Sequence, residues 1–185
     1  MIAVLLVAAL ACGSSANQME LNECAADARE RANAQELSAY RSAMQRYHND
    51  AILHESELRW LAARANACDF DAALVSGGSI EPMIEALCLA HSAQARVRDI
   101  GLFTGRLNLA AATASPQAVS EHDRVYGRLE VLLTADQRTL LTDSEEAWRR
   151  YRDEACARAT NDCATALTLT RTQELKDSWL AEPFW

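Results

Sequence analysis

Apolar side chains recur at intervals of three and four residues along most of the chain after position 17. Leu37, Tyr40, Met44 and Tyr47, for example, fall on one side of a single helix. The positions between them are rich in Ala, Glu, Arg and Gln, which are strong helix formers. The pattern predicts helices over residues 18–47, 52–68, 80–107, 117–133, 136–157 and 162–180.

Two segments interrupt this periodicity. Residues 75–82 read Val-Ser-Gly-Gly-Ser-Ile-Glu-Pro and form the one clear loop. In this loop Ser79 can cap the next helix, and Pro82 is tolerated in its first turn. Residues 108–116 are an Ala-, Thr- and Ser-rich link between the two halves of the chain. Because the link is short and not strongly polar, we expect the halves to pack as one continuous helical body.

The two halves repeat one pattern of uncommon residues. Each has Trp, Arg and Cys at intervals of four, then a second Cys, and a second Arg eight residues after it. Trp and Cys are rare, so the coincidence indicates a true repeat. The members are Trp60, Arg64, Cys68, Cys88 and Arg96 in the first half, and Trp148, Arg152, Cys156, Cys163 and Arg171 in the second.

The spacing of four places each Trp, Arg and Cys on one face of a helix. Each of these Cys residues lies at the end of its helix, and the second Cys lies at the start of the next helix. Disulfides Cys68–Cys88 and Cys156–Cys163 would therefore each cross-link a helical hairpin. Cys156–Cys163, which closes the shorter loop, would raise the free energy of unfolding by roughly 2–3 kcal/mol. We expect the repeated Trp side chains to lie in the core and the repeated Arg side chains to form structural ion pairs.

The predicted fold is accordingly all-α, a disulfide-stapled helical bundle built from two related three-helix units. The units span residues 18–107 and 117–180. The first unit carries extra residues between its two repeat cysteines, and these include the Gly-Gly loop.

Composition supports a helical, globular protein and narrows its partners. Of 185 residues, 50% are hydrophobic, and only 6 Gly and 3 Pro occur, which argues against β-sandwiches and barrels. The net charge of −8 repels phosphate backbones, so the sequence predicts no nucleic-acid partner. The same charge suits a basic protein partner.

Residues 1–11 are predicted to be an export signal, because residues 2–11 are uncharged and apolar but too short to span a bilayer. Two processing alternatives remain. Cleavage after Ala9-Leu10-Ala11 leaves Cys12 as the first mature residue, whereas a loose lipobox would place a lipid on Cys12, the only membrane attachment that the sequence suggests. Six cysteines without a CxxC motif favour disulfides over zinc, and their even number favours the first alternative.

Several short motifs carry a family resemblance. They are Gln-Met-Glu-Leu-Asn-Glu-Cys-Ala at 18–25, the Trp–Arg–Cys helices at 60–68 and 148–156, Gly-Gly-Ser-Ile-Glu-Pro-Met at 77–83, and the Cys-to-Arg segments 88–96 and 163–171. Together they resemble the LprI-type lysozyme-inhibitor family of bacterial envelopes, in full over 18–100 and in shortened form over 123–178. The second copy lacks the Met-Asn-x-Cys type of opening and the Gly-Gly-Ser loop.

The resemblance implies a periplasmic or envelope binding protein that inhibits lysozyme. It also implies a Cys12–Cys24 bridge, since the family opening often has a cysteine at that distance. We interpret the inhibition as occlusion of the lysozyme cleft. The candidate binding residues are those of the irregular loop, Ser76, Gly77, Gly78, Ser79 and Glu81.

Alternatives to this interpretation exist at two levels. The loop is equally well explained as a plain connector between helices. The protein as a whole could instead be a general envelope interaction or stress protein that binds another periplasmic partner or peptidoglycan.

Catalysis is not predicted. His48 and His54 are six residues apart and do not share a helix face, and His54-Glu55 lacks the second His of a metalloprotease motif. Neither a Gly-x-Ser-x-Gly motif nor a phosphate-binding loop occurs. The sequence predicts no catalytic residue, cofactor or metal site, and it leaves the oligomeric state open.

Overall fold

The computed structural model describes residues 17–103, 115–157 and 161–178. Within these ranges the chain is all-α, as predicted, and contains no strand. The helices are α2 (Gln18–Arg46), α3 (Ala51–Ala73), α4 (Glu81–Phe103), α5 (Pro116–Glu130), α6 (Ala135–Ala155) and α7 (Asn161–Asp177).

Local capping explains where several of these helices begin. Asn17 caps α2, and its side chain accepts from the Glu20 backbone N–H while the Glu20 carboxylate accepts from the Asn17 backbone N–H. Thr134 and Gln137 form the same reciprocal pair at the start of α6. Asp50 caps α3. Each cap satisfies backbone donors that the helix cannot pair itself, which typically stabilises a helix by about 1 kcal/mol.

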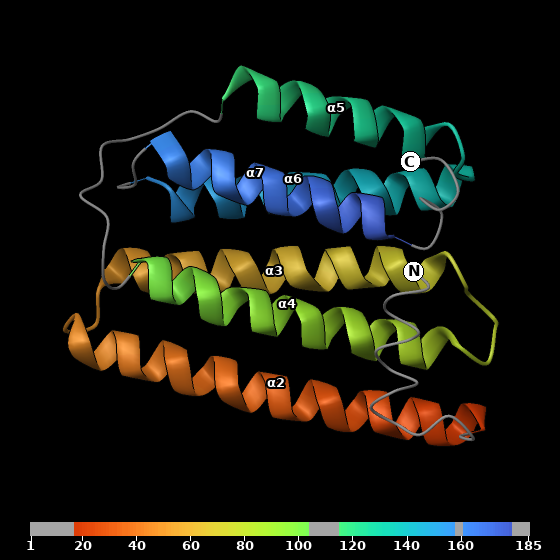
Figure 1. The fold of residues 1–185 in the computed structure, drawn as a ribbon, viewed down its shortest axis with the longest axis horizontal. Coiled ribbons are helices and arrows are strands. Elements are labelled where there is room, and N and C mark those ends of the chain that lie inside the picture. Colours follow the sequence, from red (N-terminus) through yellow and green to blue (C-terminus); the bar gives the residue numbers. More distant parts are fainter. Residues whose placement is uncertain (1–16, 104–114, 158–160, 179–185) are drawn as a thin grey trace.

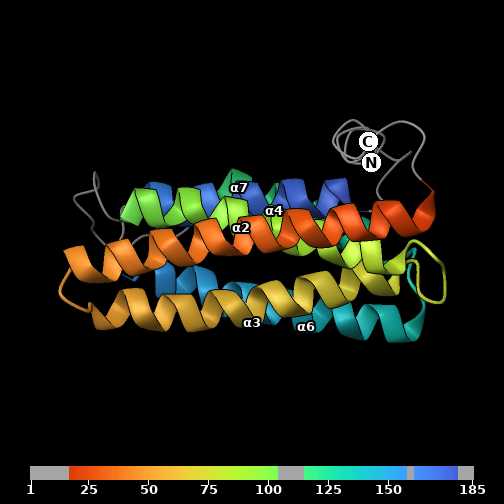
Figure 2. The same cartoon turned by 90° about the horizontal axis from the view of Figure 1, so that it is seen from below.

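The six helices lie side by side along the long axis of the molecule (Figure 1). In the first unit α4 packs against both α2 and α3, and in the second unit α7 packs against both α5 and α6. The units meet through an extensive contact between α3 and α6 (Figure 2), which are the equivalent Trp-bearing helices of the repeat and run in opposite directions. The two units therefore form one body.

The core confirms that the units are not separate bundles. One apolar cluster contains Trp60 and Ala63 of α3 together with Trp148, Tyr151 and Leu167 of the second unit. A second cluster contains Phe70 of the first unit and apolar side chains of the second unit. These are Val125, Leu129, Leu141 and Leu175. Because Phe70 is only 1% exposed, its burial depends on the other half of the chain.

The end of α3 differs from the prediction. The sequence analysis ended this helix at Cys68, but it continues to Ala73. Nothing between these residues breaks a helix, and burial of Phe70 and Ala72 holds the extra turn against the core. In the second unit the repeat does end at its cysteine, because Cys156 is the C-cap of α6. The predicted 108–116 link lies largely outside the described residues.

Candidate functional site

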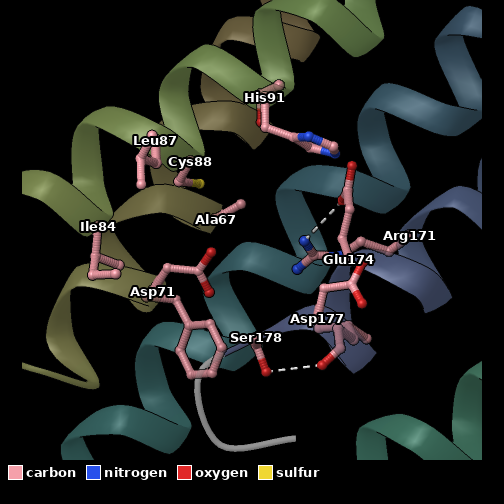
Figure 3. Close-up of a pocket in the computed structure, with 13 residues that line it drawn as sticks. Ala67, Asp71, Ile84, Leu87, Cys88, His91, Arg171, Glu174, Asp177 and Ser178 are labelled. Atoms are coloured by element: carbon pink, nitrogen blue, oxygen red, sulfur yellow. Dashed lines mark hydrogen bonds and ion pairs between the residues drawn. The ribbon is translucent and has the colours of Figure 1, made fainter. Parts of the chain in front are cut away.

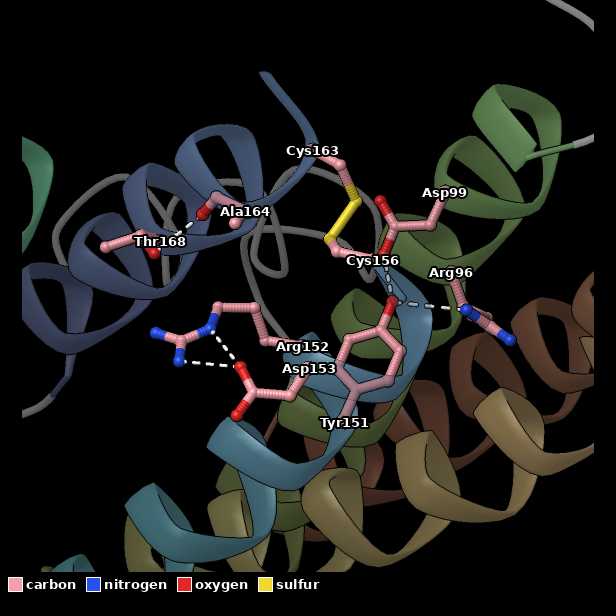
Figure 4. Close-up of a disulfide and its surroundings, with 9 residues drawn as sticks. All are labelled: Arg96, Asp99, Tyr151, Arg152, Asp153, Cys156, Cys163, Ala164 and Thr168. Carbon is pink, nitrogen blue, oxygen red and sulfur yellow. Dashed lines mark hydrogen bonds and ion pairs between the residues drawn. A yellow bond between two sulfur atoms is a disulfide. The ribbon is translucent and has the colours of Figure 1, made fainter. Parts of the chain in front are cut away.

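The two hairpin disulfides are present as predicted. Cys68–Cys88 joins α3 to α4 with a Cα–Cα distance of 5.5 Å, and Cys156–Cys163 joins the end of α6 to α7 with a distance of 5.8 Å (Figure 4). Cys24 on α2 is also disulfide-bonded. Its predicted partner, Cys12, lies outside the described residues. The Cys156–Cys163 bridge thus closes its unit where α6 ends. Cys68 and Cys88 instead lie within α3 and α4, because α3 continues past Cys68, so the first bridge does not sit at the predicted helix end and helix start.

The loop between α3 and α4 is exposed at Ser76, Gly77, Gly78 and Ser79. Gly77 has φ of +78°, a left-handed conformation that favours glycine. Its backbone N–H donates to the Glu81 carboxylate at 2.7 Å, and the Glu81 backbone N–H donates to the Gly78 carbonyl at 3.1 Å. The Glu81 side chain therefore stabilises the loop from within. The polar groups that the loop exposes are the hydroxyls of Ser76 and Ser79 and the backbone.

Contacts with the rest of the first unit fix the loop in place. The Asn22 side-chain amide of α2 donates to the Ser79 carbonyl at 3.2 Å. Next to it, Ile80 and Met83 pack in one apolar cluster with Ala25. The Cys68–Cys88 bridge ties the helices on either side. Together these contacts hold a glycine-rich loop in one shape on the protein surface.

Arg96 of α4 is fully buried at the contact between the units. Its guanidinium donates to Glu57 Oε2 at 3.0 Å, to Ser56 Oγ at 3.0 Å and to the Tyr151 hydroxyl at 3.1 Å. The Tyr151 hydroxyl in turn donates to Asp99 Oδ2 at 2.8 Å (Figure 4). A charge that is buried needs such partners, and here one of them comes from the second unit.

Arg171 of α7 makes the equivalent contacts in the second unit. It donates to Glu145 Oε1 at 2.7 Å, to Ser144 Oγ at 2.6 Å and to Glu174 Oε2 at 3.3 Å. The His122 Nε2 atom lies 3.0 Å from Glu145 Oε2. Burial alone would raise the pKa of Glu145, but the charge of Arg171 and the contact with the His122 ring outweigh it and lower that pKa to about 2.

The remaining repeat arginines lie against tryptophan rings. The Arg64 guanidinium is 5.2 Å from the centroid of Trp60, and the Arg152 guanidinium is 5.0 Å from that of Trp148. Arg64 also donates to the Asn33 side chain at 2.5 Å and to a backbone carbonyl of α4. The structure places all four repeat arginines in structural contacts.

The spacing of the second repeat Arg and an acid three residues after it points to Asp99 and Glu174, and Glu174 does pair with Arg171, but the repeat pattern did not include the buried partners Glu57 and Glu145. Both units have Ser-Glu four and three residues before the Trp, so the longer shared pattern is Ser-Glu-x-x-Trp-x-x-x-Arg-x-x-x-Cys. Extending the repeat by one helical turn would have identified Ser56-Glu57 and Ser144-Glu145. Each unit also has a tyrosine about 20 residues before its Trp, Tyr40 and Tyr126. The position four residues before this tyrosine was harder to find, because it is Glu36 in one unit and His122 in the other.

Glu36 is the exceptional acid of the first unit. Its side chain is buried near Glu57, and its Oε1 atom has no hydrogen-bond partner among the described residues. Burial, reinforced by the Glu57 carboxylate, raises the pKa of Glu36 to about 7. The two units thus place a carboxyl pair and a His–Glu pair at equivalent points.

The described residues contain neither a candidate metal site nor a candidate membrane span. Histidine, cysteine and acidic side chains form no group there that could hold a metal ion. Among the same residues, no helix is long and apolar enough to cross a membrane.

The fold and these contacts define a class of two-unit, all-α proteins in which each disulfide-closed hairpin surrounds a buried arginine. The sequence pattern of the family described as lysozyme inhibitor LprI matches residues 11–100 and again residues 104–175. The chain belongs to this family and carries two copies of its domain.

Comparison with known proteins adds a structural relative. The crystal structure of an uncharacterized protein from Burkholderia thailandensis superposes with a TM-score of 0.70 at 17% sequence identity, over 94% of each chain. At this identity the likeness shows a shared fold. No curated protein matches the chain significantly.

Proposed function

We propose that the protein is exported to the periplasm or cell envelope, where it binds a lysozyme and inhibits it by occluding the sugar-binding cleft. Membership of the lysozyme-inhibitor family, with both domain copies present, is the observation that carries this proposal. The proposed export signal is residues 1–11, with Cys12 as the first mature residue.

The loop of residues 76–81 is the proposed contact with the cleft. It is exposed, and the Glu81 side chain and the Cys68–Cys88 bridge fix its shape before any partner arrives. A segment that is already ordered loses little conformational entropy on binding, so more of its contact energy appears as affinity. With Glu81 committed to the loop, the Ser76 and Ser79 hydroxyls and the backbone are the groups offered to a partner.

Charge favours the same partner. The chain carries a formal net charge of −8, and common lysozymes are basic. Opposite net charges accelerate encounter and are screened by salt. The proposed complex should therefore form faster at low ionic strength.

The test is clearing of a cell-wall suspension by a chicken-type lysozyme, with and without the oxidised mature protein, at two salt concentrations. We expect stoichiometric inhibition that weakens as salt rises. Absence of inhibition would contradict the proposal for this lysozyme type, and pull-down from an envelope extract free of lysozyme would then identify another partner.

Loop variants test the contact surface. We expect Ser79→Ala to weaken inhibition by removing an exposed hydroxyl, and Glu81→Ala to weaken it more by releasing the Gly77 backbone N–H. Losses of about three- to tenfold correspond to one hydrogen bond. Ser120→Ala, which changes an exposed hydroxyl on α5, is the matched control. Inhibition that is equal in all variants would remove the loop from the contact.

A further inference from the structure

A cavity of about 140 Å³ lies between α3, α4 and α7 (Figure 3). It is at the same end of the molecule as the 76–81 loop, because that loop joins α3 to α4, which form two of its walls (Figure 1). Its apolar lining includes Phe70, Leu87 and Leu175. Carboxylates of Asp71 on α3 and of Glu174 and Asp177 on α7 also line it.

A difference between the repeats accounts for open space beside Arg171. In the first unit the Arg96 guanidinium meets the phenol of Tyr151, which lies three residues after Trp148. The equivalent position after Trp60 is Ala63, so no phenol meets Arg171. A hollow of about 40 Å³ is lined by both Ala63 and Arg171, and it shares Arg171 with the larger cavity.

Negative charge in the cavity is not balanced by its own residues. Among the described residues that line it, the groups able to carry positive charge are Arg171, which is already paired with Glu145 and Glu174, and His91 of α4. Within the described residues no hydrogen bond or ion pair reaches the Asp71 carboxylate, which points into the cavity (Figure 3). Burial, together with the Glu174 carboxylate, raises the pKa of Asp71 to about 7 against the opposing charge of Arg171. Among the described residues Asp71 therefore has no directly bonded cation, and only the more distant charge of Arg171 acts on it.

We propose that this cavity receives a lysine side chain of the basic protein partner, an inference that rests on the proposed function. The apolar wall would contact the methylene stem, Asp71 would bind the ammonium group, and Glu174, which also accepts from Arg171 at 3.3 Å, would add a second acceptor. A compact ammonium with three donors suits carboxylates that approach from two different helices. The planar guanidinium of arginine suits two oxygens of one carboxylate. A partner seated on the 76–81 loop would be next to the cavity.

The site itself is tested with butylammonium, which carries the stem and the cation of lysine. Titration into the ¹⁵N-labelled, oxidised protein at pH 8 should shift the amide signals of Asp71, His91 and Glu174, and binding should weaken toward pH 6 as Asp71 becomes protonated. Asp71→Asn should weaken binding at least about tenfold, since it removes a charged hydrogen-bond acceptor. Asp69→Asn, an exposed acid on the same helix, is the matched control.

A loss of butylammonium binding in Asp71→Asn would not be caused by a loss of stability. Within the described residues Asp71 makes no side-chain bond that the variant would lose, and a neutral amide removes a partly buried charge, so Asp71→Asn should be at least as stable as the native protein. Equal butylammonium affinity in the Asp71→Asn and Asp69→Asn variants would overturn the inference. So would signal shifts that appear only after the chain is shortened beyond Ser178, because residues 179–185 would then be the occupant.

Lysozyme inhibition separates this inference from the proposed function. If the native protein inhibits lysozyme and Asp71→Asn inhibits as well as Asp69→Asn, the inferred lysine contact is wrong and the proposed function stands. If Asp71→Asn alone loses inhibition about tenfold or more, both are supported. If the native protein does not inhibit lysozyme, the proposed function is wrong. The cavity then cannot bind a lysine of lysozyme in that role, and the butylammonium titration alone decides whether it binds an alkylammonium group.

Discussion

Arg96 and Arg171 are the buried charged residues around which the polar contacts of the interior are formed. Each donates to a glutamate and a serine of the neighbouring helix. A buried ion pair contributes little net stability compared with apolar residues of the same size, because both charges lose their hydration. Removing one partner is different, since the other charge stays buried and unpaired. The arginines therefore make the packing of their helices specific.

Substitution of Arg96 by Ala should lower the free energy of unfolding by about 3–5 kcal/mol, because Glu57 is left buried without its cation. Urea unfolding followed by tryptophan fluorescence measures the loss. The control is Arg59→Ala, which removes only the exposed pair with Glu55 and should change stability by less than about 1 kcal/mol. Similar losses in the two variants would contradict a structural role specific to Arg96.

Glu36 should make stability depend on pH near neutrality. Its pKa is raised from 4.5 to about 7 in the folded protein, so the folded state binds the proton more tightly than the unfolded state does. Stability is therefore greatest below pH 4.5 as far as Glu36 is concerned, and it falls as pH rises through 7, by about 1–3 kcal/mol. Urea midpoints measured between pH 5 and 8 should show this fall.

Glu36→Gln should reduce the fall between pH 5 and 8 and leave the acid limb unchanged, while Asp71, whose pKa is also raised to about 7, accounts for the fall that remains. The acid limb reflects Glu145, whose pKa is lowered to about 2, so its contribution is present above pH 4.5 and is lost as pH falls toward 2. A Glu36→Gln profile that falls between pH 5 and 8 as steeply as the native profile would assign the whole effect to Asp71 or another group.

At the level of the helices and their connections, the two disulfides close loops of different lengths. Cys68–Cys88 spans 20 residues and Cys156–Cys163 spans 7. Cross-linking reduces the entropy of the unfolded chain only slightly more for the longer loop, so their contributions to stability should be similar, about 2–3.5 kcal/mol each. Their contributions to function should differ, because only Cys68–Cys88 cross-links the two helices that carry the 76–81 loop.

Replacement of both Cys68 and Cys88 by Ala should therefore weaken lysozyme inhibition more than replacement of both Cys156 and Cys163. Thermal unfolding and the clearing assay, run on the same two double variants, measure stability and inhibition separately. If inhibition fell equally in both, in proportion to lost stability, the first bridge would have no special role in holding the loop.

Most helices and two of the disulfides could be predicted from the sequence, since helical periodicity and the repeat are local signals. The end of α3 could not, because Phe70 is held by residues of the second unit that periodicity does not reveal. The residues of the loop could be predicted from the sequence, but the role of Glu81 could not. A carboxylate that accepts a hydrogen bond from the Gly77 backbone has the same sequence signature as an exposed acid. The cavity depends on contacts between units, and the repeat pattern did not include Ala63 or Tyr151.

At the scale of the whole molecule, the two units share one core and should unfold together. The α3–α6 contact, the burial of Phe70 and the Arg96–Tyr151 bond all cross from one unit to the other. Far-UV circular dichroism and tryptophan fluorescence should therefore give coincident urea transitions. Two separated transitions would contradict a single cooperative body.

Tyr151→Phe tests the polar link between units. Loss of the hydroxyl leaves Arg96 and Asp99 each without one buried hydrogen bond, which should lower stability by about 1–3 kcal/mol. The transition should move to lower urea as one curve. Tyr126→Phe is the control, since the Tyr126 hydroxyl bonds an exposed Thr142 within the second unit.

The contact between α3 and α6 joins equivalent surfaces in opposite directions, which is the arrangement of a two-fold symmetric dimer. In a dimer of identical single units, any substitution at that contact would appear twice, once on each side of the axis. A tandem chain is free of this constraint. It can keep the phenol of Tyr151 against Arg96 to lock one half, while Ala63 leaves space beside Arg171 in the other half. Covalent fusion thus allows a symmetric scaffold to have one closed face and one face open to a partner.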